Sequence, residues 1–389
     1  MLQKKKFVVL LICAVSFVVF NNFLFNWAME AAHLGGSILC SRLTPDLKPK
    51  HTNVAFLKTH KTASSTMQNI LFRFAEFNNL TMALPKPNCG HQFCYPHFFS
   101  TEFVHPQTQQ PNMIANHMRF NESALQNLMS NTTIYITILR EPASMFESLF
   151  TYYSNISEAF RRVPNGSLEA FLADPLRYYR PGEDNAMYAR NTLTFDLGGD
   201  KDRPASDAAY AQAFVAKVER VFSLVMISEY FDESLVLLRH LLSWDLEDIL
   251  YVKLNMRAES SKKSLSPGLP EKIRDWNSID ARLYDYFNAS LWVKLSELGL
   301  DFVANEVNLL RHAQERLLKN CSGGQLPASE IKNKELHPWQ PSENVSIVGY
   351  DLPSNISQEA KERCLRYIMP EVPYTTKLLH SHLMRSTKT

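Results

Sequence analysis

The chain has 389 residues, a formal net charge of +2 and 45% hydrophobic residues. This charge balance is not typical of a protein that binds nucleic acid, and there are no internal repeats or low-complexity tracts. The length is sufficient for a substantial hydrophobic core. We therefore expect one large domain, or a domain with insertions, and no nucleic-acid partner.

The N-terminal residues predict a membrane anchor. Three lysines in MLQKKK (1–6) precede an apolar segment, residues 7–27, which as a helix would span about 31 Å, close to the ~30 Å hydrocarbon core of a bilayer. Because such lysines favour the cytoplasmic side, we expect a cytoplasmic tail (1–6), a transmembrane signal anchor (7–27) and single-pass type II topology. A cleaved signal peptide is the alternative. Residues 28–51 then form a stem, and residues 52–389 form the lumenal domain.

N-glycosylation sequons support the secretory pathway. They are more frequent than chance predicts, and all of them follow the apolar segment, where a lumenal domain meets the glycosylation machinery. The sequon asparagines are Asn79, Asn121, Asn131, Asn155, Asn165, Asn288, Asn320, Asn344 and Asn355.

The cysteines beyond the apolar segment suit an oxidising lumen. Cys89 and Cys94 flank a short loop that a disulfide could close, and Cys321 and Cys364 are the other plausible pair. Cys40 would then be left over, which indicates intermolecular pairing or a free thiol. Unpaired buried thiols are the alternative, because the spacing does not fix the connectivity.

Strand-like and helix-like segments alternate along the lumenal part. Short apolar runs predict strands at 53–58, 112–120, 133–140 and 222–230, and apolar periodicity predicts helices at 66–79, 143–153, 231–242 and through most of 269–319. This alternation predicts an α/β fold with a mostly parallel central sheet, flanked by helices, and a helical C-terminal part.

The stretch FLKTHKTASST (56–66) is the turn from the first strand into the first helix. A helix N-terminus is a natural anion site, and here two lysines and several hydroxyl groups add charge and hydrogen-bond donors. The alternative is an ordinary capped helix with solvated lysines, in which Ser65 or Thr66 is the cap. The Walker A pattern is absent, which counts against a kinase or ATPase.

Three polar clusters follow predicted strands: Lys58–Thr66, Asn116–Arg119 and Arg140–Ser148. In parallel α/β sheets, ligands bind beyond the carboxyl ends of the strands. We therefore expect these three clusters to converge on one site.

Several blocks resemble one family in order along the chain: FLKTHKTASST, NHMRF (116–120), ILREPASMFES (138–148), SEYFDESLVLL (228–238) and IVGY (347–350). The first is similar to the loop of Golgi sulfotransferases that binds the 5′-phosphosulfate of 3′-phosphoadenylyl sulfate (PAPS). Together they resemble the galactose-3-O-sulfotransferase family, which includes galactosylceramide sulfotransferase.

This resemblance implies a P-loop-like sulfotransferase fold, PAPS as co-substrate and a Golgi membrane location with a lumenal catalytic domain. The implied reaction is sulfation of the 3-hydroxyl of terminal β-galactose, on a glycan or galactolipid acceptor; the members acting on glycan galactose are the most similar. The alternatives are a non-catalytic glycan-binding protein and a sulfotransferase for another sugar position. A homodimer is left open.

The resemblance also assigns roles to residues. Lys61 matches the lysine that contacts the phosphosulfate bridge, and Arg140 and Ser148 match the 3′-phosphate site. Lys58 is a secondary candidate for the charge role. Further donors to the nucleotide are expected from Thr59, Thr62, Ala63, Ser64, Ser65 and Thr66.

A catalytic base must accept the proton of the acceptor hydroxyl, and histidine suits this role because its unperturbed pKa is near 6.5. His117 is slightly favoured, since related uronyl 2-O-sulfotransferases carry a catalytic histidine there. His60, inside the loop, is the rival, and a shared role is the third option. Glu147 is the next candidate.

Residues 184–191 are expected to contribute to the acceptor pocket. No metal site is expected, because the spacing typical of zinc ligands is absent.

Overall fold

The computed structural model describes residues 48–258, 261, 264–341 and 345–386. Lys50–Thr389 make up one compact unit. The predicted tail and anchor, most of the stem and Cys40 lie outside the described residues. Among the residues described, no helix combines the length and apolar character needed to cross a membrane.

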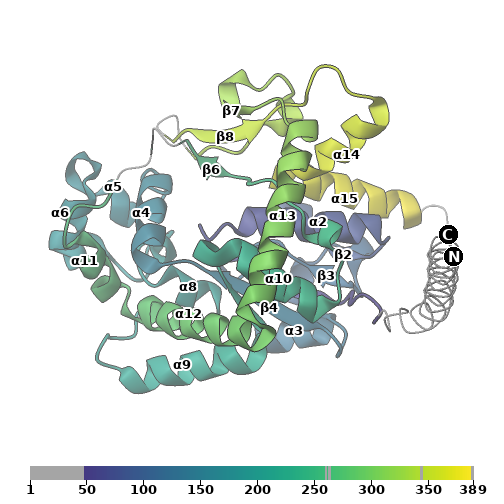
Figure 1. Cartoon of the computed structure of the whole chain (residues 1–389). Coiled ribbons are helices and arrows are strands. Elements are labelled where there is room, and N and C mark those ends of the chain that lie inside the picture. Colours follow the sequence, from purple (N-terminus) through teal and green to yellow (C-terminus); the bar gives the residue numbers. More distant parts are fainter. Residues whose placement is uncertain (1–47, 259–260, 262–263, 342–344, 387–389) are drawn as a thin grey trace, which may run out of the picture. The chain divides into compact units, whose positions relative to one another are not determined.

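A five-stranded parallel sheet forms the centre of the unit (Figure 1). The strands run β2–β3–β1–β4–β5 across the sheet, and β1 pairs with both β3 and β4. β1 reads VAFL and is buried at every position, which suits a central parallel strand covered on both faces. The bounds are β1 Val54–Leu57, β2 Met82–Ala83, β3 Met113–Ile114, β4 Ile134–Leu139 and β5 Leu224–Ile227. The predicted parallel α/β sheet is confirmed.

Helices make up about half of the rest of the described chain, and the predicted helices are present. Among them, α2 follows β1, α4 follows β4 with Pro142 as its first residue, and α10 follows β5. The helices are α2 Ser64–Phe77, α3 Glu122–Leu128, α4 Pro142–Tyr152, α5 Glu158–Arg161, α6 Leu168–Ala173, α7 Pro175–Tyr178, α8 Thr192–Asp196, α9 Ala208–Val221, α10 Phe231–Leu242, α11 Leu269–Trp276, α12 Ser278–Leu298, α13 Leu300–Cys321, α14 Gln358–Ile368 and α15 Glu371–Ser386. The helical C-terminal part is therefore confirmed.

A second, antiparallel sheet was not predicted from the sequence. It consists of β6 (Met256–Arg257), β8 (Ile347–Tyr350) and β7 (Gln325–Pro327), in that order. Strands this short carry little periodicity of their own, so the pairing depends on tertiary contacts. Figure 1 shows this sheet beside the upper end of α13, away from the central sheet.

The C-terminal helix α15 packs against α2, the helix that begins at the lysine-rich loop (Figure 1). A segment at the end of the sequence therefore lies beside the first helix of the unit. Both proposed disulfides are present, Cys89–Cys94 and Cys321–Cys364, and the second joins the end of α13 to α14.

Candidate active site

The three polar clusters meet at the carboxyl edge of the central sheet, as predicted. The Lys58 amine, after β1, lies 2.7 Å from Nε2 of His117, which follows β3. The Arg140 guanidinium, after β4, donates to the carbonyl oxygen of Lys61 at 3.0 Å. Residues that are 59 and 79 positions apart in the chain are thus direct neighbours.

The loop between β1 and α2 adopts an unusual backbone without using glycine. Lys61 and Ala63 have positive φ values of 59° and 63°, a left-handed conformation that is uncommon for residues with a Cβ and often marks functional sites. Ala63 is the N-cap of α2 and no side chain caps the helix, so neither Ser65 nor Thr66 has the capping role of the alternative interpretation. Within the described residues, the N–H groups of residues 61–65 donate to no other group, as expected at an open helix N-terminus.

Most hydroxyl groups of the loop bond to the protein itself. Thr59 donates to the carbonyl of Ile138, Ser64 donates to the carbonyl of Thr59 at 2.6 Å, and the Thr59 and Thr62 hydroxyls are 2.8 Å apart. The Thr66 hydroxyl accepts from the N–H of Leu254 at 3.0 Å. These bonds hold the shape of the loop, and they leave the backbone N–H groups of residues 61–65 as donors without a partner among the described residues.

Lys61 lies in a strongly cationic environment. Its amine sits over the ring of Tyr152, 3.5 Å from the ring centroid, which is a cation–π contact. Burial lowers the pKa of the Lys61 amine to about 7. Nearby positive charges add to this effect, on Arg257, Arg140 and Lys58. A site that collects so many cations is suited to a polyanionic ligand.

Arg140 directly follows β4, and Ser148 lies in α4. The Arg140 side chain also donates through Nε to the hydroxyl of Ser144 at 3.1 Å, so its planar head is fixed. Ser148 is buried, two turns along α4. Its neighbour Glu147 accepts two bonds from Arg257, at 3.0 and 2.5 Å. Because its carboxylate is engaged in this ion pair, Glu147 is a weaker candidate for the base.

His60 forms a buried pair with Asp196. Its backbone N–H donates to the carboxylate at 2.9 Å, and its Nδ1 lies 3.0 and 2.9 Å from the two carboxylate oxygens. Tyr95 donates to the same carboxylate at 2.8 Å. Since a carboxylate only accepts, Nδ1 carries the proton and Nε2 of the neutral ring has a free lone pair. That Nε2 is buried and has no partner among the described residues.

His117 is engaged at both ring nitrogens. Its Nδ1 donates to the carbonyl of Lys58 at 3.0 Å, so its Nε2 accepts from the Lys58 ammonium. Burial, the Lys58 charge and His60 hold the pKa of His117 well below its usual range. The Lys58 ammonium also pairs with Glu371, the first residue of α15, at 2.9 Å.

The two histidine rings stack on each other, with centroids 4.1 Å apart and an angle of 12°. Tyr188 packs edge-on against His60 at 5.2 Å and stacks on Tyr153 at 3.7 Å. Tyr188 belongs to residues 184–191, so one residue of that stretch does lie beside the candidate base. Among the described residues, no group of three or more His, Cys, Asp or Glu side chains is placed to hold a metal ion.

Sequence reasoning missed four residues of this site: Tyr95, Asp196, Arg257 and Glu371. Each comes from a segment without a recognisable motif, and each reaches the site through tertiary packing. Asp196 alone carried a signal, since it is an acidic residue within the apolar run LTFDL (193–197). A buried carboxylate requires a partner.

Comparison with known proteins decides the family. A model of the galactose-3-O-sulfotransferase family matches residues 1–382. The chain belongs to this family. It is 57% identical to galactose-3-O-sulfotransferase 3 of Bos taurus, over 87% of this chain and 80% of that protein. It is 44% identical to galactosylceramide sulfotransferase of Homo sapiens, over 84% and 78%. It is 42% identical to galactose-3-O-sulfotransferase 2 of Sus scrofa, over 90% and 92%. The family and enzyme class expected from the sequence blocks are confirmed.

Proposed function

We propose that this member of the family transfers a sulfuryl group from PAPS to the 3-hydroxyl of a terminal β-galactose. The observation that carries the proposal is the position of Lys61, just before the N-terminus of α2, next to His60 in the same loop, whose ring is paired with the buried carboxylate of Asp196 from α8. An anion site and a base with a free lone pair are the two elements that sulfuryl transfer to a hydroxyl requires. The family match supports the choice of this reaction over kinase chemistry.

The donor would bind along the cationic edge of the sheet. The N–H groups of residues 61–65 and the Lys61 ammonium suit the 5′-phosphosulfate, since a helix N-terminus favours anions. Arg140, with its fixed planar head, and Ser148 suit the 3′-phosphate. The P-loop-like sulfotransferase fold belongs to this proposal, and the β1–loop–α2 unit supports it.

In the transfer step, His60 accepts the proton of the acceptor hydroxyl at Nε2 while Asp196 stabilises the imidazolium that forms. The hydroxyl oxygen forms a bond to sulfur, and the bond from sulfur to the bridging phosphate oxygen breaks. Lys61 stabilises the negative charge that develops on that oxygen, an interaction stronger in the transition state than in the ground state. Lys58 and Glu371 hold His117 as a neutral ring beneath His60.

A neutral sugar is a better acceptor for this chain than a polyanionic one. The net charge is +2, and no long basic tract is present to grip a sulfated polysaccharide. The relatives named above act on galactose or galactosylceramide, which supports a β-galactoside of a glycan or galactolipid. Tyr188 and Tyr153, beside His60, are our candidates for contact with the sugar.

We place the catalytic domain in the Golgi lumen, held by the predicted signal anchor at residues 7–27. The two disulfides of the described unit support an oxidising compartment. Protease protection of the full chain in sealed microsomes, with glycosidase treatment of the protected product, tests this topology.

Retention on immobilised adenosine 3′,5′-bisphosphate tests the donor site. The full chain should be retained, and free PAPS should elute it. Arg140→Ala and Ser148→Ala should weaken retention and raise the KM for PAPS. Arg220→Ala is a matched control, because Arg220 lies on α9 and pairs with Glu122, outside this site. Unchanged retention of the Arg140 and Ser148 variants would remove both residues from the nucleotide site, and a wild-type chain that is not retained would favour a glycan-binding protein.

A further inference from the structure

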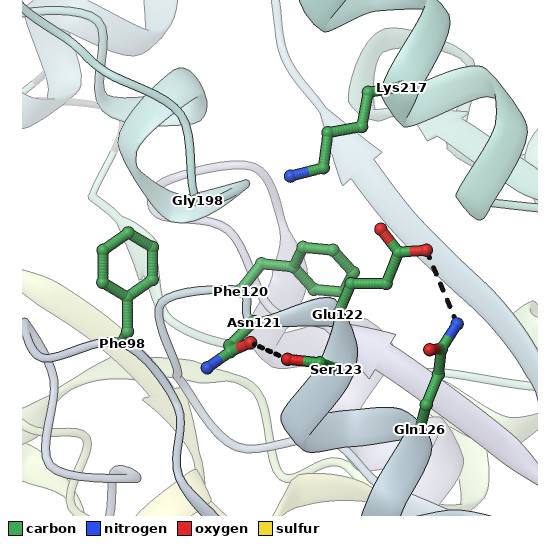
Figure 2. Close-up of a pocket in the computed structure, with 8 residues that line it drawn as sticks. All are labelled: Phe98, Phe120, Asn121, Glu122, Ser123, Gln126, Gly198 and Lys217. Carbon is green, nitrogen blue, oxygen red and sulfur yellow. Dashed lines mark hydrogen bonds between the residues drawn. The ribbon is translucent and has the colours of Figure 1, made fainter.

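A pocket of about 510 Å³ lies at the start of α3, on a part of the unit that the proposed reaction does not use. Figure 2 shows it between the N-terminal turn of α3, the Gly198 loop and Lys217 of α9. Two phenyl rings and several polar groups line it: Phe98, Phe120, Asn121, Glu122, Ser123, Gln126, Gly198 and Lys217.

Two of the lining residues belong to a sequon. Asn121, Glu122 and Ser123 form Asn-x-Ser, and both Asn121 and Ser123 face the pocket (Figure 2). We propose that Asn121 carries an N-linked glycan and that its innermost N-acetylglucosamine occupies this pocket. The sugar in the pocket would thus be covalently attached to Asn121, one of the residues that line the pocket.

The Asn121 side chain is already held in one orientation. Its Oδ1 accepts from the N–H of Ala124 at 3.4 Å, which caps α3, and from the Ser123 hydroxyl at 3.1 Å. Its Nδ2 donates to the carbonyl of Phe99 at 3.0 Å. The amide has two hydrogens on Nδ2, so one can be replaced by a sugar while the other keeps the bond to Phe99. Asn121 can therefore still cap α3 after glycosylation, and its bond to Phe99 fixes the direction in which the first sugar leaves Nδ2.

The modification step needs a lipid-pyrophosphate-linked oligosaccharide as donor, which the secretory pathway supplies to sequons. A bond forms between Nδ2 and C1 of the first sugar, the bond from C1 to the pyrophosphate oxygen breaks, and the Nδ2 proton is released. Nothing is oxidised or reduced. The proposal depends on entry of the chain into that pathway and is independent of its transferase activity.

The chemistry of the pocket suits a pyranose ring. Phe98 is 46% exposed, and its ring is held in place by the Arg119 guanidinium 3.7 Å from the centroid. An exposed phenyl face can cover the apolar C–H face of a sugar, with gain from buried apolar area. Around it, Gln126 and Lys217 offer donors to hydroxyl and acetamide oxygens, and the Glu122 carboxylate is fixed by two bonds from Arg220.

Asn155 provides a matched comparison within the same chain. It belongs to the sequon Asn155-Ile156-Ser157, and its side chain is exposed in the turn between α4 and α5. A glycan on Asn155 would extend into solvent, whereas one on Asn121 would begin in the pocket. The two sequons should therefore differ in how easily a glycosidase reaches the first sugar.

The test is site-resolved deglycosylation of the full chain expressed in mammalian cells. A peptide amidase that cleaves the sugar–asparagine bond is applied in ¹⁸O water, first to native and then to denatured protein, and labelled aspartate is quantified by mass spectrometry. We expect Asn121 to be occupied and to lose its glycan at least tenfold more slowly than Asn155 in the native protein, with equal rates after denaturation. Phe98→Ala should abolish the native difference while leaving occupancy unchanged.

An unmodified Asn121 peptide would overturn the proposal. Equal native rates at Asn121 and Asn155 would show an occupied sequon whose sugar lies outside the pocket, which also contradicts it. Ser123→Ala provides a second measurement, because it removes the sequon but keeps Asn121 as the helix cap. This variant should lower Tm, and Asn155→Gln should not; a Ser123→Ala protein as stable as wild type would argue against a docked sugar.

Discussion

At the scale of single residues, the two stacked histidines differ in what their ring nitrogens contact. Nδ1 of His60 donates to Asp196 and its Nε2 has no partner within the described part of the chain. His117 uses one nitrogen to donate to a carbonyl and the other to accept from Lys58. The sequence placed both rings in one site but slightly favoured His117. The contacts with Asp196 and Lys58 leave the lone pair on Nε2 of His60 free and occupy the lone pair on Nε2 of His117. No local sequence pattern encodes these contacts.

His60→Ala should therefore remove the base. We expect kcat to fall by about 10²- to 10⁴-fold, the usual contribution of general base catalysis, and the acidic limb of the pH–rate profile to disappear. His117→Ala should lose activity by less and keep the acidic limb. Initial rates between pH 5 and 9, with PAPS binding measured in parallel, distinguish the variants. An acidic limb that persists in His60→Ala but vanishes in His117→Ala would reverse the assignment.

Lys61 should produce an alkaline limb. Its pKa is lowered from 10.5 to about 7 in the free protein, so the ammonium is present below that pH and is lost as pH rises through it. Because kcat/KM reports ionisation of the free enzyme, kcat/KM for PAPS should decline above about pH 7. Lys61→Arg keeps its charge at every accessible pH, so this limb should be absent, whereas Lys61→Ala should cost about 10²- to 10³-fold in kcat. An unchanged alkaline limb in Lys61→Arg would assign it to another group.

At the scale of elements, local sequence pattern was sufficient to predict the two strand–helix junctions at the centre of the site. Buried β1 runs into the amphipathic helix α2, Pro142 begins α4 directly after β4, and both junctions are visible in the sequence. The elements that complete the site were not visible. β6 supplies Arg257 through a two-residue strand, and α15 supplies Glu371 from more than 300 positions beyond Lys58. Such contacts depend on how the elements pack, and periodicity within one segment does not contain that information.

The C-terminal helix should act on catalysis through Glu371. Glu371→Gln removes the charge that faces the Lys58 ammonium, and we expect kcat/KM to fall about 10- to 100-fold from the resulting misplacement of Lys58 and His117. Glu76→Gln is the matched control. Glu76 also ties α2 to α15, through Lys377 at 2.7 Å and Tyr374 at 2.8 Å, but it belongs to neither histidine network.

A double-mutant cycle separates this positioning role from a structural one. If Glu371 acts through Lys58, Glu371→Gln should have little further effect on kcat/KM in a Lys58→Gln background. Additive losses, or an equal loss in Glu76→Gln, would show that α15 contributes only to stability.

At the scale of the whole molecule, the enzyme class was predicted from the family resemblance and not from the composition. Net charge gave no sign of nucleic-acid binding, and length indicated one large domain or a domain with insertions, but both are compatible with many enzymes. The pairing of Cys321 with Cys364 joins two C-terminal helices and was proposed from the sequence only as one of several connectivities. We propose that the aromatic rings around His60 contact the acceptor, and of these only the stretch containing Tyr188 was anticipated from the sequence.

The most direct test of the central claim is the position of the transferred group. The purified compact unit, residues 50–389, is incubated with PAPS and a panel of acceptors: terminal β-galactose, 3-O-methyl galactose, terminal N-acetylglucosamine and heparosan. We predict a sulfated product on terminal galactose and none on the 3-O-methyl sugar, with the activity of Lys61→Ala on galactose lower by about 10²- to 10³-fold. Equal labelling of the 3-O-methyl sugar, or labelling of heparosan alone, would contradict a galactose 3-O-sulfotransferase.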